Sequence, residues 1–83
     1  MPQPIRSQVD CIKMLLAESS QEERELLKPH IEAYGANAGK MFNIPLDPNV
    51  AKIFADAEAA IDAAFEARYG MKTLPYLFKH NPL

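Results

Sequence analysis

Apolar side chains recur at helical spacing in three segments of the chain. In residues 4–19 and 48–69 the apolar positions stand three or four apart, which places them on one face of a helix. The first stripe comprises Ile5, Val9, Ile12 and Leu16, and the second comprises Val50, Phe54, Ala57, Ile61, Phe65 and Tyr69. Asp47 followed by Pro48 is typical of a helix start, and Gly70 is typical of a helix end. The residues before that start, 43–48, are expected to form a linker.

Residues 20–42 carry a similar stripe, interrupted by residues that disfavour a helix. Ser20 and Glu23 have the spacing of a capping box, which predicts a helix start. The apolar positions that follow are Leu27, Ile31, Tyr34, Ala38 and Met41. Pro29 removes one backbone hydrogen bond and clashes with the carbonyl group four residues earlier. We therefore expect either one kinked helix or two helices that meet near Pro29.

The C-terminal tail, residues 71–83, is apolar but lacks a helical pattern. Pro75 and Pro82 exclude a long helix, so the tail is expected to be extended or to form a single turn after Thr73. Four large apolar side chains stand within five positions, namely Leu74, Tyr76, Leu77 and Phe78. Burying each of them is worth about 1.5–3 kcal/mol. They either cover the chain's own helices or insert into another protein or a second copy of the chain.

Together these elements predict an all-α fold, a small bundle of three to four helices in a single domain over residues 1–83. The chain has a mass of 9.3 kDa, and 48% of its residues are apolar. A chain of this size buries only about 63% of the surface that its unfolded form exposes. The core is therefore thin, and a partner protein or a second copy is one way to extend it.

The charges argue against a nucleic-acid partner. Nine basic and eleven acidic residues give a net charge of −2, and no two basic residues are adjacent. A nucleic-acid-binding domain would gather basic residues on one face. Acidic residues do recur four apart at Glu58, Asp62 and Glu66. This acidic stripe is either a solvated helix face or a docking surface for a cationic partner.

The residue types and spacings of a catalytic or metal site are not found in the sequence. Cys11 is the single cysteine, and its apolar neighbours predict a buried thiol that behaves as a small apolar group. His30 and His80 each lack a second metal ligand at helical spacing. Residues 35–40 differ from a phosphate-binding loop in glycine spacing and in lacking Ser or Thr after Lys40. We expect no cofactor, no metal and no enzymatic activity.

The compartment is predicted from cysteine content and hydropathy. A single cysteine excludes an intramolecular disulfide bond. The longest uninterrupted apolar run, residues 14–17, is too short to cross a membrane, and the first residues lack the pattern of a signal peptide. We expect a cytoplasmic protein without membrane contact.

These observations favour a small protein–protein interaction module that acts without catalysis as a regulator, inhibitor or accessory subunit, a role common among phage and mobile-element proteins. Two alternatives stay open. One is a helix-turn-helix-like DNA-binding domain, and the other is a small-ligand binder at an oligomer interface. The identity of the partner protein and a homo-oligomeric state are also left open. The candidate partner-binding residues come from the tail and the acidic stripe: Tyr76, Leu77, Phe78, Lys79, His80, Glu58, Asp62 and Glu66.

Overall fold

The computed structural model describes residues 5–80 and confirms the all-α class. Within that range there is no strand. None of the described helices is long and apolar enough to cross a membrane. The predicted helix start at residue 4 and the last tail residues, 81–83, lie outside the described part of the chain. The elements are α1 (Gln8–Glu18), α2 (Gln21–Ala38), the 3₁₀-helix η1 (Gly39–Phe42), α3 (Pro48–Tyr69) and α4 (Thr73–His80).

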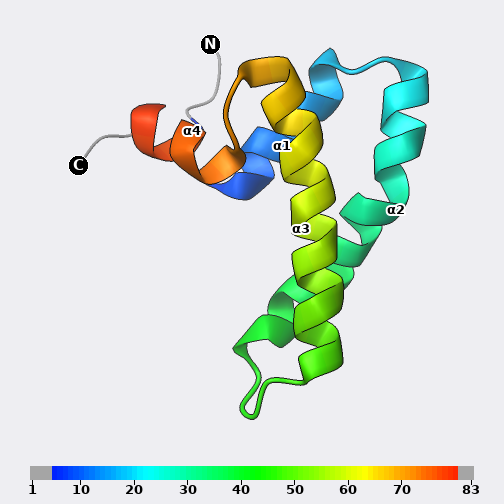
Figure 1. Ribbon diagram of the computed structural model, residues 1–83, viewed down its shortest axis with the longest axis vertical. Helices are drawn as coiled ribbons and strands as arrows, with labels where there is room; N and C mark the ends of the chain where they lie inside the picture. Colours follow the sequence, from blue (N-terminus) through cyan, green and yellow to red (C-terminus); the bar gives the residue numbers. More distant parts are fainter. Residues whose placement is uncertain (1–4, 81–83) are drawn as a thin grey trace.

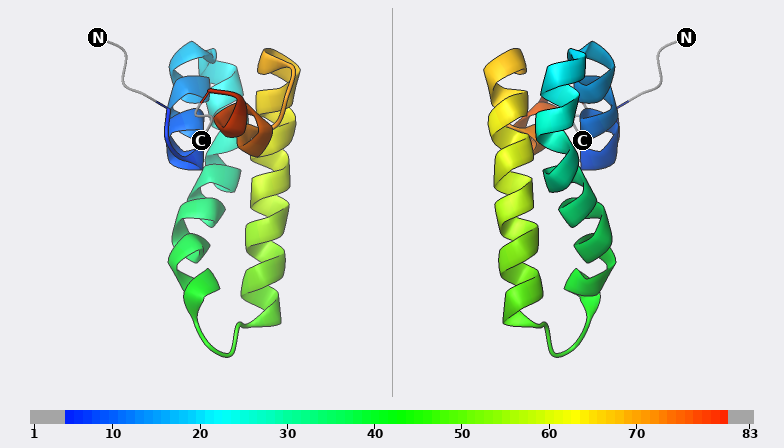
Figure 2. Two further views of the ribbon diagram at one scale, coloured as in Figure 1. Left: turned by 90° about the vertical axis from the view of Figure 1, so that its left-hand side faces the viewer. Right: turned by 90° about the vertical axis from the view of Figure 1, so that its right-hand side faces the viewer.

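The helices form a hairpin that is covered at one end only. α2 and α3 run antiparallel, and α3, with 22 residues, is about 33 Å long. α1 and α4 both pack where α2 begins and α3 ends (Figures 1 and 2). At the opposite end, η1 and the first turns of α3 have no third helix beside them (Figure 2). The molecule thus has a four-helix end and a two-helix end.

α1 begins later than the apolar spacing predicts, because Ser7 caps it. Ser7 Oγ accepts a hydrogen bond from the backbone N–H of Asp10 at 3.3 Å. The Asp10 carboxylate in turn accepts one from the backbone N–H of Arg6 at 2.9 Å. The first bond satisfies an N–H group that has no partner inside the helix, and the second joins the residue before the cap to the first turn. They fix the start of α1 at Gln8 and leave Ile5 outside the helix.

α2 starts at the predicted capping box and continues through Pro29. Ser20 Oγ accepts a hydrogen bond from the Glu23 N–H at 3.2 Å, and the Glu23 carboxylate accepts one from the Ser20 N–H at 3.1 Å. The alternative of two helices meeting near Pro29 is wrong, because one helix spans Gln21–Ala38. The ribbon of α2 changes direction along its length (Figure 1). The missing N–H of an internal proline is a common cause of such a bend.

Both predicted limits of α3 are confirmed. The Asp47 side chain accepts a hydrogen bond from the Asn49 N–H at 2.8 Å, and Pro48 takes the first helical position. Gly70 ends the helix with a φ of 80°, a left-handed conformation that glycine adopts without strain. The long helix is therefore defined by local sequence at both ends.

The core is small and lies at the four-helix end. In α1 the buried face is centred on Cys11 and Leu15, whereas Val9 of the predicted stripe is half exposed. The stripe of α3 is confirmed, since Ile61 and Phe65 are buried. Half-buried apolar side chains from every α-helix pack around a central cluster. That cluster consists of Cys11, Leu15, Leu27 and Phe65.

Polar contacts also hold α1 and α2 against the end of α3. The Arg68 guanidinium donates to the Glu23 carboxylate at 3.0 Å and joins α3 to the start of α2. The Tyr69 hydroxyl donates to the Glu18 carboxylate at 2.5 Å and joins α3 to the end of α1. Burial and the Glu18 carboxylate raise the pKa of Tyr69. The Tyr69 hydroxyl therefore remains a donor at neutral pH.

Candidate functional site

The tail forms the helix α4, which has eight residues and about two turns. It is therefore more helical than the extended or single-turn form that the sequence predicts. Pro75 stands at the third helical position, where a backbone N–H would have no partner inside the helix, so it does not interrupt the helix. The Tyr76 N–H donates to the Lys72 carbonyl at 3.1 Å and closes the first turn.

Asp62 of α3 caps the start of α4. Its Oδ1 atom accepts hydrogen bonds from the Thr73 N–H at 3.2 Å and from the Thr73 hydroxyl at 2.7 Å. These bonds satisfy an otherwise unpaired N–H and place a carboxylate at the positive end of the helix dipole. The capping residue lies eleven positions before the N–H that it satisfies. The sequence of the tail alone therefore gives no sign of the cap.

Gln8 extends this contact into a polar cluster that joins all four α-helices. Its Nε2 donates to the Thr73 hydroxyl at 3.1 Å and to the Glu58 carboxylate at 3.0 Å. Its Oε1 accepts from the Tyr34 hydroxyl at 3.2 Å. Burial and the carboxylates of Glu58 and Asp62 raise the pKa of Tyr34, so its hydroxyl stays a donor at neutral pH. We call this set the polar cluster: Gln8, Tyr34, Glu58, Asp62 and Thr73. Its side chains hydrogen-bond to one another and thereby fix the positions of the helices.

The acidic stripe is divided between internal and exposed side chains. Glu58 and Asp62 are half-buried, and each accepts hydrogen bonds from residues of other helices. Glu66, one turn further along α3, is exposed. Two of the three carboxylates are therefore engaged within the chain. A role of the stripe in docking a cationic partner stays a prediction.

One face of α4 packs on the core. The Tyr76 ring meets the Phe65 ring edge-on, with 5.2 Å between the centroids, and lies 5.9 Å from the Tyr69 ring. Leu77 is half-buried against the core cluster. Two of the predicted partner-binding residues, Tyr76 and Leu77, thus complete the chain's own core.

The opposite face of α4 leaves Leu74 and Phe78 exposed. These residues stand four apart and share one helix face, and 48% and 72% of their surfaces are accessible. Lys79 and His80 are also exposed, although the His80 ring lies 4.2 Å from the Tyr76 ring. We refer to Leu74, Phe78, Lys79 and His80 as the α4 surface.

The charge around the α4 surface differs in sign from that of the remaining chain. Residues 67–80 contain three basic residues, Arg68, Lys72 and Lys79, and no Asp or Glu. Their contribution is +3 while the whole chain carries −2, so the other residues together carry −5. Because Arg68 is paired with Glu23, the basic residues that accompany the apolar α4 surface are Lys72 and Lys79.

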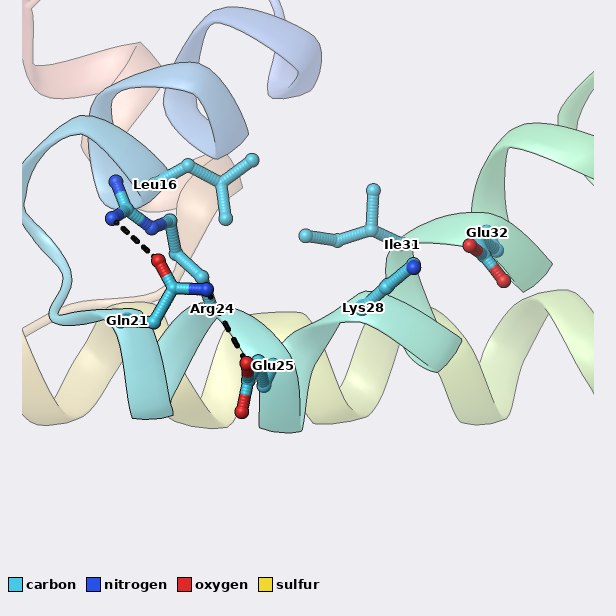
Figure 3. Close-up of a pocket in the computed structure, with 7 residues that line it drawn as sticks. All are labelled: Leu16, Gln21, Arg24, Glu25, Lys28, Ile31 and Glu32. Carbon is cyan, nitrogen blue, oxygen red and sulfur yellow. Dashed lines mark hydrogen bonds between the residues drawn. The ribbon is translucent and has the colours of Figure 1, made fainter.

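A groove of about 430 Å³ lies between the end of α1 and the outer side of α2 (Figure 3). The Arg24 guanidinium donates to the Gln21 side chain, and the Gln21 amide donates to the Glu25 carboxylate, each at 3.3 Å. The lining of the groove contains no Cys, His, Ser or Thr. The lining consists of the apolar side chains Leu16 and Ile31 and the polar side chains Gln21, Arg24, Glu25, Lys28 and Glu32.

Possible metal ligands do not gather in residues 5–80, and the thiol lies in the core. In residues 5–80, no group of three or more His, Cys, Asp or Glu side chains is placed to hold a metal ion. Cys11 is fully buried, as predicted. Burial raises the pKa of the Cys11 thiol, and the carboxylates of Asp10 and Asp62 raise it further. The thiol is therefore a protonated, apolar part of the core.

Four exposed apolar residues also lie at the two-helix end, and their exposure was not predicted from the sequence. They lie in η1, the connection after it and the start of α3. Residues 43–48 were expected to form a linker, and apolar residues outside a periodic pattern give no indication of their exposure. We call this set the tip surface: Phe42, Ile44, Leu46 and Ile53, which are 85%, 97%, 40% and 47% exposed.

Comparisons of the chain with protein-family models, with curated proteins and with solved structures find no match. The function is therefore inferred from the surfaces and side chains described above.

Proposed function

We propose that the protein is a non-catalytic binding module that docks on another protein through the α4 surface. The observation that carries this proposal is the exposure of Leu74 and Phe78 on a helix whose other face is fixed in the core. Asp62 and Tyr76 hold α4 in place before any partner arrives. A preorganised apolar helix face loses little conformational entropy on binding.

The charge around α4 indicates the class of partner. Apolar anchors accompanied by Lys72 and Lys79 suit a partner surface with an apolar centre and an acidic rim. Complementary rim charges accelerate association and are screened by salt. We therefore expect binding that is faster and tighter at low ionic strength.

A module of this kind acts by covering a surface of its partner, as a regulator, inhibitor or accessory subunit does. The polar cluster supports this reading over catalysis, because its carboxylates and hydroxyls are hydrogen-bonded to one another and hold the helices together. The DNA-binding and small-ligand alternatives stay predictions, since no side-chain arrangement in the described residues favours either.

Affinity capture followed by reconstitution tests the proposal. The double variant Leu74→Ser/Phe78→Ser removes both apolar anchors, and exposed substitutions of this kind change stability little. We expect wild-type protein to capture a partner that this variant loses. With the purified partner, Kd should rise at least about tenfold in the variant. The wild-type Kd should also rise between about 50 and 300 mM salt, because salt screens the charges at the rim.

The control is Phe42→Ser/Ile44→Ser, which removes two apolar side chains that are more exposed than Leu74 and Phe78, at the other end of the molecule. This control should keep the partner. If the partner binds the α4 variant as tightly as wild type, or if it is lost only with the control, the α4 surface is not the docking site and the proposal fails.

A further inference from the structure

We infer that the tip surface is an interface between two copies of this chain, which meet end to end through Phe42, Ile44, Leu46 and Ile53. The tip surface lies at the end of the molecule opposite to α1 and α4 (Figures 1 and 2). The inference therefore concerns a different surface from α4 and does not rest on the proposed function.

The construction of the two-helix end leaves these side chains uncovered. Between the two helices, the Tyr34 and Phe54 rings stack with 4.8 Å between their centroids, which fills the inside of the hairpin. No third helix reaches the outside of this end (Figure 2). Phe42 and Ile44 are nearly as accessible as in an unfolded chain. An isolated monomer would keep them in water, at a cost in free energy that a second copy removes.

The area of the tip surface matches what a dimer needs. A fully exposed side chain of this size presents roughly 200 Å², so the exposed fractions of the four residues amount to roughly 500 Å². A standard interface buries roughly 800 Å² of each partner, of which about 56–65% is apolar, or roughly 450–520 Å². The exposed area of the tip surface is thus comparable to the apolar part of such an interface.

The charges around the tip surface favour a second copy over a charged partner. Residues 40–56 contain two cations, Lys40 and Lys52, and two anions, Asp47 and Asp56, so their net charge is zero. Lys52 and Asp56 already pair with each other at 2.9 Å. In a two-fold symmetric dimer a surface meets itself, so a rim of one sign would repel its copy whereas a neutral rim does not. The tip surface differs in this respect from the basic α4 surface.

Sedimentation velocity on the full chain tests the inference. Between about 1 and 200 μM, wild-type protein should shift from a monomer to a dimer of twice 9.3 kDa. The variant Phe42→Ser/Ile44→Ser should raise the dimer Kd at least about tenfold, while Leu74→Ser/Phe78→Ser should leave it unchanged. Because the rim is neutral, the dimer Kd should change less than about threefold between 50 and 500 mM salt.

Circular dichroism at low micromolar concentration should show the same helix content in both variants, because the replaced side chains lie outside the core. A wild-type chain that stays monomeric throughout the range overturns the inference. A dimer that survives in the tip variant, or that is lost only in the α4 variant, overturns it equally.

Cross-linking gives a second readout that does not depend on removing apolar side chains. Asn43 lies in the exposed connection beside Phe42 and Ile44. Under mild oxidation Asn43→Cys should form a covalent dimer, whereas Lys79→Cys on α4 should not, and the buried Cys11 does not interfere. Equal cross-linking of the two variants would contradict an end-to-end dimer through the tip surface.

Discussion

Replacing Asp62 tests whether α4 depends on the cap that α3 supplies. In Asp62→Ala the Thr73 N–H loses its acceptor, and the Thr73 hydroxyl keeps only Gln8 as a partner. The negative charge at the start of α4 is lost as well. We expect α4 to detach from the core more often, which exposes Phe65 and withdraws the edge-on contact with Tyr76.

The expected loss of stability follows from the two hydrogen bonds. A hydrogen bond to a charged group contributes about 1.5–3 kcal/mol, and the half-buried position of Asp62 favours the lower part of that range. Two such bonds give about 3–4 kcal/mol in the free energy of unfolding. For a domain of this size each kcal/mol lowers Tm by about 4–8 °C. Asp62→Ala should therefore lower Tm by roughly 12–32 °C.

Thermal unfolding followed by circular dichroism measures this change, and hydrogen exchange of residues 73–80 locates it. Glu66→Ala is the matched control, because Glu66 lies one turn further along α3 and is exposed; its effect should stay within about 0.5 kcal/mol. If Asp62→Ala melts within 3 °C of Glu66→Ala, on the order of the shift expected for a neutral surface change, the capping argument is refuted.

Three further predictions concern the core, the thiol and the response to acid. Phe65→Ala removes a fully buried ring and should cost about 3–5 kcal/mol, measured by urea denaturation. Cys11 should react with a thiol reagent at pH 8 roughly 100-fold more slowly in the folded chain than in urea, because burial raises its pKa and blocks access. Hydrogen bonds from Ser20 hold the pKa of Glu23 below its ordinary value of 4.5, so its ionised form stabilises the fold above that pH and the contribution is lost as pH falls below it. The stability of Glu23→Gln should accordingly fall less on acidification than that of the wild type. Denaturation curves of both proteins at several pH values between about 3 and 6 measure this difference. Equal pH dependence in the two proteins would contradict a stabilising role of the Glu23 carboxylate.

Local sequence was sufficient to predict most of the helix limits. The capping box of Ser20 and Glu23, the start at Asp47 and the end at Gly70 all depend on residues within four positions of one another, and all three are confirmed. The apolar spacing of α3 also identified its buried face, because a long regular helix keeps its phase. The sequence did not decide whether the helix bends or ends at Pro29, because an internal proline is compatible with both.

The features that the sequence did not predict depend on contacts between distant segments. α4 is a helix because Asp62, on another element, satisfies its first N–H. The division of the tail into Tyr76 and Leu77 inside and Phe78 outside follows from that docking. Likewise, the exposure of Ile44 follows from the absence of a third helix beside the two-helix end (Figure 2).

The polar cluster has a consequence for the order in which the chain folds. Gln8 and Thr73 are 65 positions apart, so their hydrogen bond closes nearly the whole chain into one loop. The contacts of the α2–α3 hairpin are more local and cost less chain entropy to form. We therefore expect the hairpin to form first and the four-helix end to close last. During synthesis the polar cluster cannot be completed around Glu58 and Asp62 until Thr73 has been added. Pulsed hydrogen exchange should show that α1 gains protection only together with α4.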